Sequence, residues 1–243
     1  MKVVLFDLGG TLIDDTRISW RELNRIGFAG LCDSLSKQGF SLPSTDEVCA
    51  VLDDVTSRDW EWSLDTLRCR SIKSSVLEGL RQLGLHQTRY DLEECLRAFH
   101  AAVSGEIRML DGVPSVLEQL VEIGLRMGLV SNTSWTSSMH AETLERLGIS
   151  RFFDCMVFSS DVGVMKPHPR IFLTALARVS ALPGDAVFVG DSWQDDVLGA
   201  QRVGMQAVLV KSDCKALVEP SVMPSGGAIA QLTQLPLLLE ALG

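Results

Sequence analysis

Residues 3–12 read Val3-Val4-Leu5-Phe6-Asp7-Leu8-Gly9-Gly10-Thr11-Leu12. The first four are apolar, which predicts a strand buried on both faces, as strands inside a parallel sheet are. A carboxylate directly after such a strand, followed by two glycines, can project into a cleft while the backbone approaches a ligand closely. The same pattern taken alone also fits a simple turn capped by Asp7, so its meaning depends on the rest of the chain.

From residue 107 onward, short apolar runs alternate with helix-length amphipathic segments, which is typical of βαβ units. The predicted strands are residues 126–130, 155–158, 186–189 and 206–210, and the predicted helices are 114–123, 139–147, 169–179, 195–203 and 236–242. We therefore expect an α/β fold, with a parallel sheet that carries helices on both faces.

Residues 17–106 lack this alternation and have the pattern of several helices. The predicted helices are residues 19–36, 45–57, 60–83 in one or two pieces, and 90–104. A helical block after the first strand of an α/β sheet is expected to be an inserted all-α cap. Because open α/β sheets carry their active sites at the carboxyl ends of the strands, the cap would close over the site. The expected domains are a core of residues 1–16 and 107–243 and a cap of residues 17–106.

Composition narrows the class of protein. With 243 residues, the chain has room for one large domain or one domain plus a smaller insertion. The formal net charge of −9 argues against a nucleic-acid partner, because phosphate backbones are bound by clustered Lys and Arg. No signal peptide or apolar span is evident, and the six cysteines lack C-x-x-C spacing. We expect a cytoplasmic protein with reduced thiols and no membrane partner, as a monomer or a homodimer.

Two segments near predicted strand ends offer groups that bind anions. Ser131 and Asn132 could donate hydrogen bonds to an anion at a helix start, although simple helix capping explains them as well. Lys166 stands in a loop that two prolines, one on each side of His168, make stiff. A rigidly placed ammonium group suits phosphate, whereas His168 is expected to have a structural role.

The segment Gly190-Asp191-Ser192-Trp193-Gln194-Asp195-Asp196 places three carboxylates where a strand gives way to a helix. Such groups repel one another unless a cation or hydrogen-bond donors compensate. Mg²⁺ prefers hard oxygen ligands and is bound by one or two carboxylates with substrate phosphate. Helix capping by Asp195 and Asp196 is the alternative.

The order of these segments carries more information than any one of them. Asp7, Ser131, Lys166 and Asp191 follow in sequence at or near strand ends, and this combination resembles the four motifs of the haloacid dehalogenase superfamily. The resemblance covers the first dozen residues and residues from about 111 to 210, and its most specific phrases are Lys166-Pro167-His168-Pro169 and Gly190-Asp191-Ser192. It implies a Rossmann-like core, and by position alone it identifies the helical block as the family's cap.

The resemblance also implies residue roles and a cofactor. Asp7 would be the nucleophile of a Mg²⁺-dependent phosphatase that forms an aspartyl-phosphate and acts on a small phosphorylated metabolite. Ser131 and Lys166 would complete the catalytic set by holding phosphoryl oxygens, and Thr11 would brace the loop. The expected phosphate contacts are Gly10, Thr11, Ser131, Asn132 and Lys166, and the expected Mg²⁺ ligands are Asp7, Gly9 through its carbonyl, Asp191 and Asp196, with Asp195 as an alternative to Asp196.

Gly9 departs from the family pattern, because phosphatases of this superfamily usually carry a general acid–base Asp at that position. Three interpretations follow. The first is a phosphatase restricted to good leaving groups, or one that takes its acid from Asp14, Asp15, His168 or the cap. The second is a dehalogenase, or a phosphonatase with Lys37 or Lys73 as its Schiff-base lysine. The third is a protein that binds a phosphorylated ligand with little or no turnover.

Aromatic residues give only a weak indication of the substrate. Trp20, Trp60 and Trp62 could stack on a ring, but their helical spacing favours packing in the core of the cap. Trp193, inside the acidic segment, is the aromatic residue that we expect nearest to the site.

Overall fold

The computed structural model describes residues 1–14, 16–86, 90–210 and 224–242. Its centre is a six-stranded sheet with the order β3-β2-β1-β4-β5-β6, in which every neighbouring pair is parallel. The strands are β1 (Val3–Phe6), β2 (Arg126–Ser131), β3 (Cys155–Phe158), β4 (Ala186–Gly190), β5 (Gln206–Val210) and β6 (Ala228–Ile229). The four strands predicted after residue 107 are confirmed to within one residue, and the two-residue β6 is too short to leave a sequence pattern.

The β1 strand is buried on both faces, as its sequence predicts. Val4 and Phe6 belong to one hydrophobic cluster, whereas Val3 and Leu5 belong to a second cluster on the other face of the sheet. All four side chains are at most 1% exposed. Alternate side chains of a strand point to opposite faces, so an unbroken apolar run is the pattern that a central strand needs.

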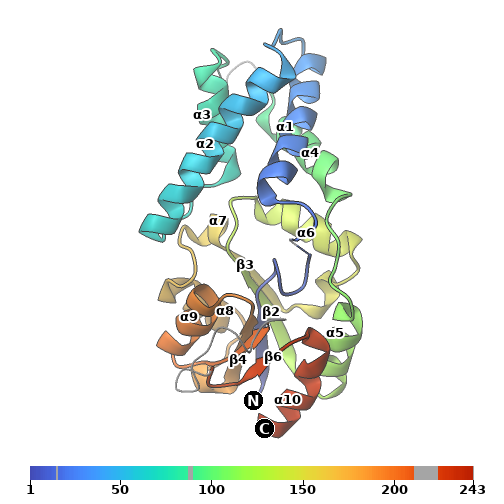
Figure 1. The fold of residues 1–243 in the computed structure, drawn as a ribbon, viewed down its shortest axis with the longest axis vertical. Coiled ribbons are helices and arrows are strands. Elements are labelled where there is room, and N and C mark those ends of the chain that lie inside the picture. The colour runs from blue at the N-terminus through green and yellow to red at the C-terminus, as the bar shows by residue number, and fades with distance from the viewer. Residues whose placement is uncertain (15, 87–89, 211–223, 243) are drawn as a thin grey trace.

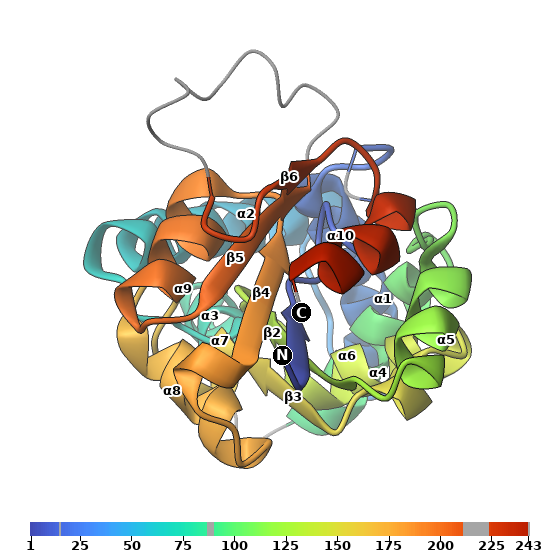
Figure 2. The ribbon, with the colours of Figure 1, turned by 90° about the horizontal axis from the view of Figure 1, so that it is seen from below.

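Helices cover both faces of the sheet, as Figure 2 shows from below. On one face lie α5 (Val113–Glu122), α6 (Ser137–Arg146) and α10 (Leu235–Leu242), and on the other lie α8 (Pro169–Arg178) and α9 (Leu198–Arg202). Shorter pieces are α7 (Ser159–Val162), a π-helix at Trp193–Val197, and 3₁₀ turns at Ser150–Phe152, Pro183–Asp185 and Leu232–Gln234. The fold is the expected Rossmann-like α/β architecture.

Four helices form the end of the molecule beyond the carboxyl edge of the sheet (Figure 1). They are α1 (Trp20–Lys37), α2 (Thr45–Thr66), α3 (Ile72–Gln82) and α4 (Leu92–Ser104). Ser19 and Ser44 begin α1 and α2 with reciprocal capping boxes. Phe28 and Phe99 meet between α1 and α4 with ring centroids 5.6 Å apart. These helices share one buried hydrophobic cluster with α5 and α6.

The helix predicted over residues 60–83 in one or two pieces is divided in two, but the break predicted at residues 58–59 is wrong. The α2 helix runs through these residues to Thr66 and ends at Leu67, which has a left-handed backbone with φ 55°. Ser71 then caps α3. Residues 58–59 contain no glycine or proline, so nothing in the backbone stops the helix there.

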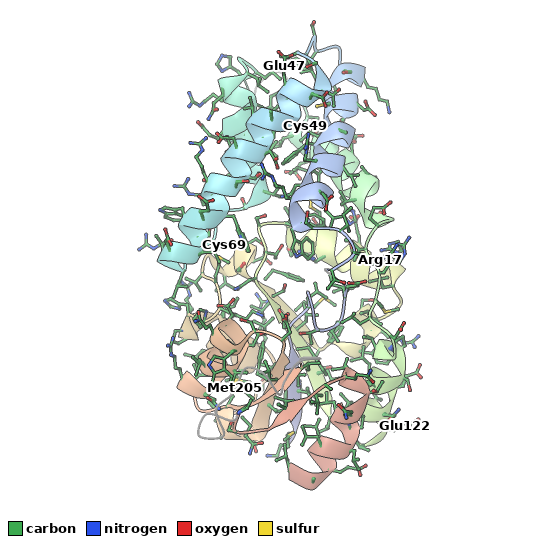
Figure 3. All side chains as sticks on the ribbon, viewed as in Figure 1. Arg17, Glu47, Cys49, Cys69, Glu122 and Met205 are labelled. Carbon is green, nitrogen blue, oxygen red and sulfur yellow. The ribbon has the colours of Figure 1, made fainter. Side chains whose placement is uncertain are left out.

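The connection between α2 and α3 reaches the segment before Lys166. The Met165 amide donates to the Leu67 carbonyl (3.0 Å), and the Cys69 amide donates to the Gly163 carbonyl (3.1 Å). Figure 3 shows Cys69 at the level where the helical block meets the sheet-bearing part, with Arg17 at the same level on the other side. The block therefore touches the rest of the protein next to a predicted site loop.

The structure bears on two expectations from composition, the absence of a membrane span and the state of the cysteines. In the described ranges, no helix has both the length and the apolarity required to cross a membrane. The cysteines that the structure describes, Cys32, Cys49, Cys69, Cys95 and Cys155, are free. Cys214 lies outside the described residues.

Candidate active site at the carboxyl edge of the sheet

The predicted site residues meet at the point where the chain changes direction across the sheet. From β1, the chain proceeds through β2 and β3 on one side, and β4 to β6 lie on the other. Phe6 is in register with Leu129 of β2 and with Val189 of β4. Asp7 and Asp191 directly follow β1 and β4, and Ser131 is the last residue of β2, so all three lie at adjacent strand ends, where open α/β sheets bind ligands.

Lys166 links two carboxylates into a buried ion-pair triad. Its Nζ donates to Asp7 Oδ1 at 2.5 Å and to Asp196 Oδ1 at 2.7 Å. The three residues are 7% (Asp7), 3% (Lys166) and 1% (Asp196) exposed. An ammonium group has three hydrogen-bond donors, so the third N–H of Lys166 remains for a ligand after both carboxylates are bound.

Burial raises the pKa of Asp7 to about 7, against the opposing effect of Lys166, and the charges of Asp196 and Asp191 raise it further. Burial opposes the charged form of Lys166 too, but the carboxylates of Asp196 and Asp7 prevail and raise its pKa. Burial and the charge of Asp196 also raise the pKa of Asp195. These directions describe a pocket that holds more negative charge than one ammonium group can balance.

One oxygen each from Asp7, Asp191 and Asp196 lies within 4.8 Å of the others. Three ionised carboxylates and the ammonium group of Lys166 leave a formal charge of −2 in this cluster. A divalent cation with oxygen ligands suits such a donor set. The carboxylates predicted to bind Mg²⁺ thus fit that ion, and Gly9, whose carbonyl is the fourth predicted ligand, lines the same cavity as they do.

Two glycines make room for the acidic side chains. Gly10 has φ +74°, and a Cβ atom there would lie 2.7 Å from Asp191 Oδ2. At Gly190, a Cβ atom would lie 2.2 Å from Asp196 Oδ2. Real Cβ atoms do not approach oxygen so closely, so both carboxylates depend on a bare backbone nearby.

Gly10→Ala is expected to lower the free energy of unfolding by about 1–3 kcal/mol, because it adds a steric conflict with Asp191 to left-handed backbone strain. Thermal unfolding measures this change. Gly148→Ala is the matched control, since Gly148 has φ +75° with nothing within 4 Å of the added Cβ. Equal losses in the two variants would mean that backbone strain alone is responsible and that Asp191 does not press on Gly10.

Thr11, Asn132 and Ser131 have different places in the site. Thr11 is fully buried and donates from Oγ1 to Asp7 Oδ2 at 3.4 Å, so it braces the loop that begins at Asp7. Asn132 accepts from the Lys166 amide at 2.7 Å and donates to the Lys166 carbonyl at 3.0 Å, which fixes the lysine loop. Ser131 lines the cavity beside Asp7. Phosphate contacts of these residues and of Gly10 stay predictions.

The helix-capping alternative is wrong for Ser131 and Asn132 and is confirmed in part for the acidic segment, where Asp195 and Asp196 lie in the first helical turn. After Ser131 and Asn132, the α6 helix starts only at Ser137 and is capped by Thr136. In the acidic segment, Ser192 is the cap, and its Oγ accepts from the Asp195 amide at 3.2 Å. Asp196 lies deeper and accepts from the Ser192 amide at 3.0 Å. Ser131 and Asn132 therefore do not cap α6, whereas Asp196 combines a contact at the helix start with its contact to Lys166.

Two of the residues considered as alternative general acids, Asp14 and His168, lie outside the cavity wall. Asp14 accepts from the side chain and backbone of Thr16, which lowers its pKa, and it is not among the cavity-lining residues. His168 caps α8, where its Nδ1 accepts from the Arg170 amide at 3.1 Å. This agrees with the structural role expected for His168. Asp15 lies outside the described residues.

A cavity of about 310 Å³ joins this edge of the sheet to the helical block. Its wall includes Asp7, Gly9, Ser131, Asn132, Lys166, Asp191, Asp195 and Asp196 from the core, and Trp20, Arg21, Asn24, Asp53, Thr56, Ser57 and Trp60 from α1 and α2. The segment 133–135 and His140 complete one side. Burial lowers the pKa of His140 to about 3, so this ring stays neutral.

The expectations for tryptophan were partly wrong. Trp20 and Trp60 are 39% and 36% exposed and line the cavity instead of packing in the cap core. Trp62 packs under the Arg70 guanidinium, 4.4 Å from the ring centroid. Trp193 packs against the hydrophobic cluster under α8 and is not part of the cavity wall. Helical spacing identifies a shared face but cannot tell whether that face meets core or solvent.

Comparison with known proteins shows which family the chain belongs to. A family model described as haloacid dehalogenase-like hydrolase matches residues 1–204. Glyceraldehyde 3-phosphate phosphatase from Methanothermobacter thermautotrophicus is 29% identical, with 100% of both chains covered. The enzyme of that name from Methanopyrus kandleri is 35% identical over 141 residues, 58% of this chain and 60% of that protein. The crystal structure of 2-haloacid dehalogenase from Pseudomonas syringae has a TM-score of 0.68 at 25% identity, with 100% of both chains covered. This chain belongs to the haloacid dehalogenase-like hydrolases.

Proposed function

We propose that this hydrolase is a Mg²⁺-dependent phosphatase of a small phosphorylated metabolite, with Asp7 as the nucleophile. The observation that carries the proposal is the buried cluster of Asp7, Lys166, Asp191 and Asp196, which combines a carboxylate nucleophile, a positioned ammonium group and an acidic donor set. Two relatives named glyceraldehyde 3-phosphate phosphatase support a phosphate ester as substrate.

In this mechanism, a carboxylate oxygen of Asp7 attacks phosphorus while the bond from phosphorus to the leaving-group oxygen breaks, which gives an aspartyl-phosphate and the released leaving group. Water then attacks the phosphorus of this intermediate, which releases inorganic phosphate and restores the Asp7 carboxylate. The third N–H of Lys166 and the hydroxyl of Ser131 hold phosphoryl oxygens as their charge changes in the transition state. Asn132 keeps Lys166 in place through its backbone. Asp7, Asp191, Asp196 and the Gly9 carbonyl would hold Mg²⁺, which would supply positive charge that offsets the repulsion between nucleophile and anionic substrate.

Gly9 restricts the leaving groups in this proposal. General acid catalysis is typically worth about 10²–10⁴-fold, and a glycine at this position has no proton to give. Asp14 does not line the cavity and its pKa is lowered, so it is a poor replacement. We infer a preference for phosphates whose leaving group departs without a proton, such as acyl phosphates and sugar 1-phosphates.

In this proposal, two parts of the chain have different roles. Residues 1–16 and 107–243 act as the catalytic core, and residues 17–106 act as a cap that encloses the leaving group. The position of α1 and α2 in the cavity wall supports this division.

A dehalogenase is the second candidate, favoured by Gly9 and by the similarity to 2-haloacid dehalogenase. The acidic donor set argues against it, because dehalogenation without a metal does not use Asp191 as a metal ligand. The phosphonatase variant needs a lysine of the cap at the cavity, but neither Lys37 nor Lys73 lines it. Lys73 instead pairs with Glu93 on the surface of the helical block.

Phosphate release from acetyl phosphate, sugar 1-phosphates and glyceraldehyde 3-phosphate tests the proposal. We expect release that requires Mg²⁺, stops with EDTA, and is fastest for the good leaving groups. Absence of release from every ester by folded protein would refute the phosphatase. Metal-independent chloride release from a 2-haloacid would then establish the dehalogenase, and saturable ligand binding without product would indicate a binding protein.

A further inference from the structure

One face of α2 and the first turn of α1 form the cavity wall opposite the acidic cluster. The α2 residues on this wall follow helical spacing: Asp53, Thr56, Ser57 and Trp60. Positions i, i+3, i+4 and i+7 lie on one face of a helix. The α1 residues on this wall are Trp20, Arg21 and Asn24. This surface combines aromatic rings, one ion pair and neutral polar groups.

Only one of the two carboxylate oxygens of Asp53 has a hydrogen-bond donor in the described structure. The residue is 6% exposed, and its Oδ2 accepts from Arg21 Nε at 2.9 Å. Its Oδ1 is buried, and no donor in the described parts of the chain bonds to it. A buried acceptor without a donor is unfavourable by about 1–3 kcal/mol. Because Asp53 lines the cavity, a ligand that places a donor at this atom would remove that cost.

The charges around Asp53 favour a hydroxyl group as that donor over an ammonium group. Arg21 already balances the carboxylate, so a second cation would give the pair a net positive charge. The other polar members of the wall are neutral. Asn24 Oδ1 accepts from Trp135 Nε1 at 2.9 Å, which leaves its NH₂ group to donate. A hydroxyl group can donate to Asp53 and accept from Asn24 at once.

The rings of Trp20 and Trp60 suit the rest of such a ligand. Both line the cavity while remaining more than a third exposed. Trp20 is held edge-to-face against the buried Trp135, with ring centroids 5.5 Å apart. An aromatic ring offers a large, rigid apolar face with little conformational entropy to lose. The C–H face of a sugar matches that surface, while its hydroxyl rim matches Asp53 and Asn24.

We propose that Asp53 is a specificity-determining residue that accepts a hydrogen bond through Oδ1 from a hydroxyl of a sugar-type leaving group. The proposal rests on the phosphatase function and deepens it by naming the substrate class. Arg21 orients Asp53 in this arrangement, and the two tryptophans contact the apolar face of the sugar.

The test compares kcat/KM for single-hydroxyl deletions in wild type and in Asp53→Asn. The parent is whichever of glucose, mannose, galactose and ribose 1-phosphate is hydrolysed fastest, and the analogues are its monodeoxy derivatives. We expect one deletion to lower kcat/KM of wild type by about tenfold or more. The same deletion should have less than about a third of that effect in Asp53→Asn, because the partner is already altered.

Asp54→Asn is the matched control, since Asp54 is the next residue of α2 but is exposed and pairs with Arg58 at 3.0 Å. It should show the wild-type response to every deletion. If Asp53→Asn does not fold, the wild-type series decides alone, and deletions that all change kcat/KM by less than about threefold overturn the proposal.

Other outcomes separate this proposal from the phosphatase function. Hydrolysis of acetyl phosphate without hydrolysis of any sugar 1-phosphate overturns the role of Asp53 and leaves the phosphatase intact. Failure with both kinds of substrate and with glyceraldehyde 3-phosphate refutes the phosphatase itself. A preference for the 2-amino analogue over the parent sugar, lost in Asp53→Asn, would replace the hydroxyl ligand by an ammonium ligand and overturn the proposal as stated.

Discussion

Asp7→Asn is expected to abolish Mg²⁺-dependent phosphate release, with kcat lowered on the order of 10⁴-fold or more. The amide cannot form the acyl phosphate, and no other carboxylate both follows β1 and contacts Lys166 in the described structure. The substitution nearly preserves volume and retains an oxygen for Lys166. Initial rates with acetyl phosphate measure the loss, and acid-quenched labelling with radioactive phosphate should detect a phosphoprotein in wild type only.

Asp14→Asn is the control for this variant. Asp14 belongs to the same loop, but its Oδ1 accepts from the amide and hydroxyl of Thr16 outside the cavity wall. It should retain activity within about threefold, as expected for a surface change. If Asp7→Asn retained release and labelling while remaining folded, the nucleophile would have to be another residue. If Asp14→Asn were the inactive variant, Asp14 would be the missing acid.

The parallel sheet and the acidic groups at its carboxyl edge could be predicted, because the pattern of apolar residues over a few positions is enough to identify the strands and their ends. The apolar run of β1 has one compatible place in an α/β sheet, its centre, and the structure puts it there. Once the strands are known to be parallel, their carboxyl ends must share an edge. Asp7, Ser131 and Asp191 could therefore be brought together from the sequence without any knowledge of side-chain contacts.

The parts that could not be predicted depend on contacts between distant segments. Asn132 holds the Lys166 backbone across 34 positions, a contact that no local pattern encodes. Asp53 and Arg21 are 32 positions apart and read in sequence as ordinary charges on the solvated faces of two helices. Helical spacing would have grouped Asp53 with Trp60 on one face, but only the packing of α1 and α2 over the sheet turns that face to the cavity.

The break between α2 and α3 is a second feature that local sequence patterns do not predict. Residues 67–71 contain neither glycine nor proline, and Leu67 adopts a left-handed backbone that leucine rarely takes. That conformation is accompanied by contacts with the Lys166 side of the core, where Leu67 accepts from Met165 and Ser134 accepts from Ile72. A tertiary contact thus overrides local propensity here, and the same contact joins the helical block to the segment before Lys166.

Lys166→Met is expected to destabilise the fold by about 3–5 kcal/mol and to abolish activity. The change removes the only cation in contact with Asp7 and Asp196 in the described structure and leaves two buried carboxylates uncompensated. For a chain of this length, the midpoint of thermal unfolding should fall by roughly 6–20 °C. Lys73→Met is the control, because Lys73 pairs with Glu93 on the surface and such pairs contribute less than about 1 kcal/mol.

Two further measurements distinguish a cation site from a purely structural ion pair. Mg²⁺ should recover part of the stability of Lys166→Met, because a divalent cation held by Asp7, Asp191 and Asp196 would supply the compensation that Asp7 and Asp196 have lost. The double variant Asp7→Asn/Lys166→Met should be more stable than Lys166→Met alone, since it removes one of the unpaired charges together with the lysine. If Lys166→Met were as stable as wild type, the two carboxylates would not depend on Lys166 for electrostatic compensation. If the stability of Lys166→Met did not change with Mg²⁺, this would count against the acidic cluster as a metal site.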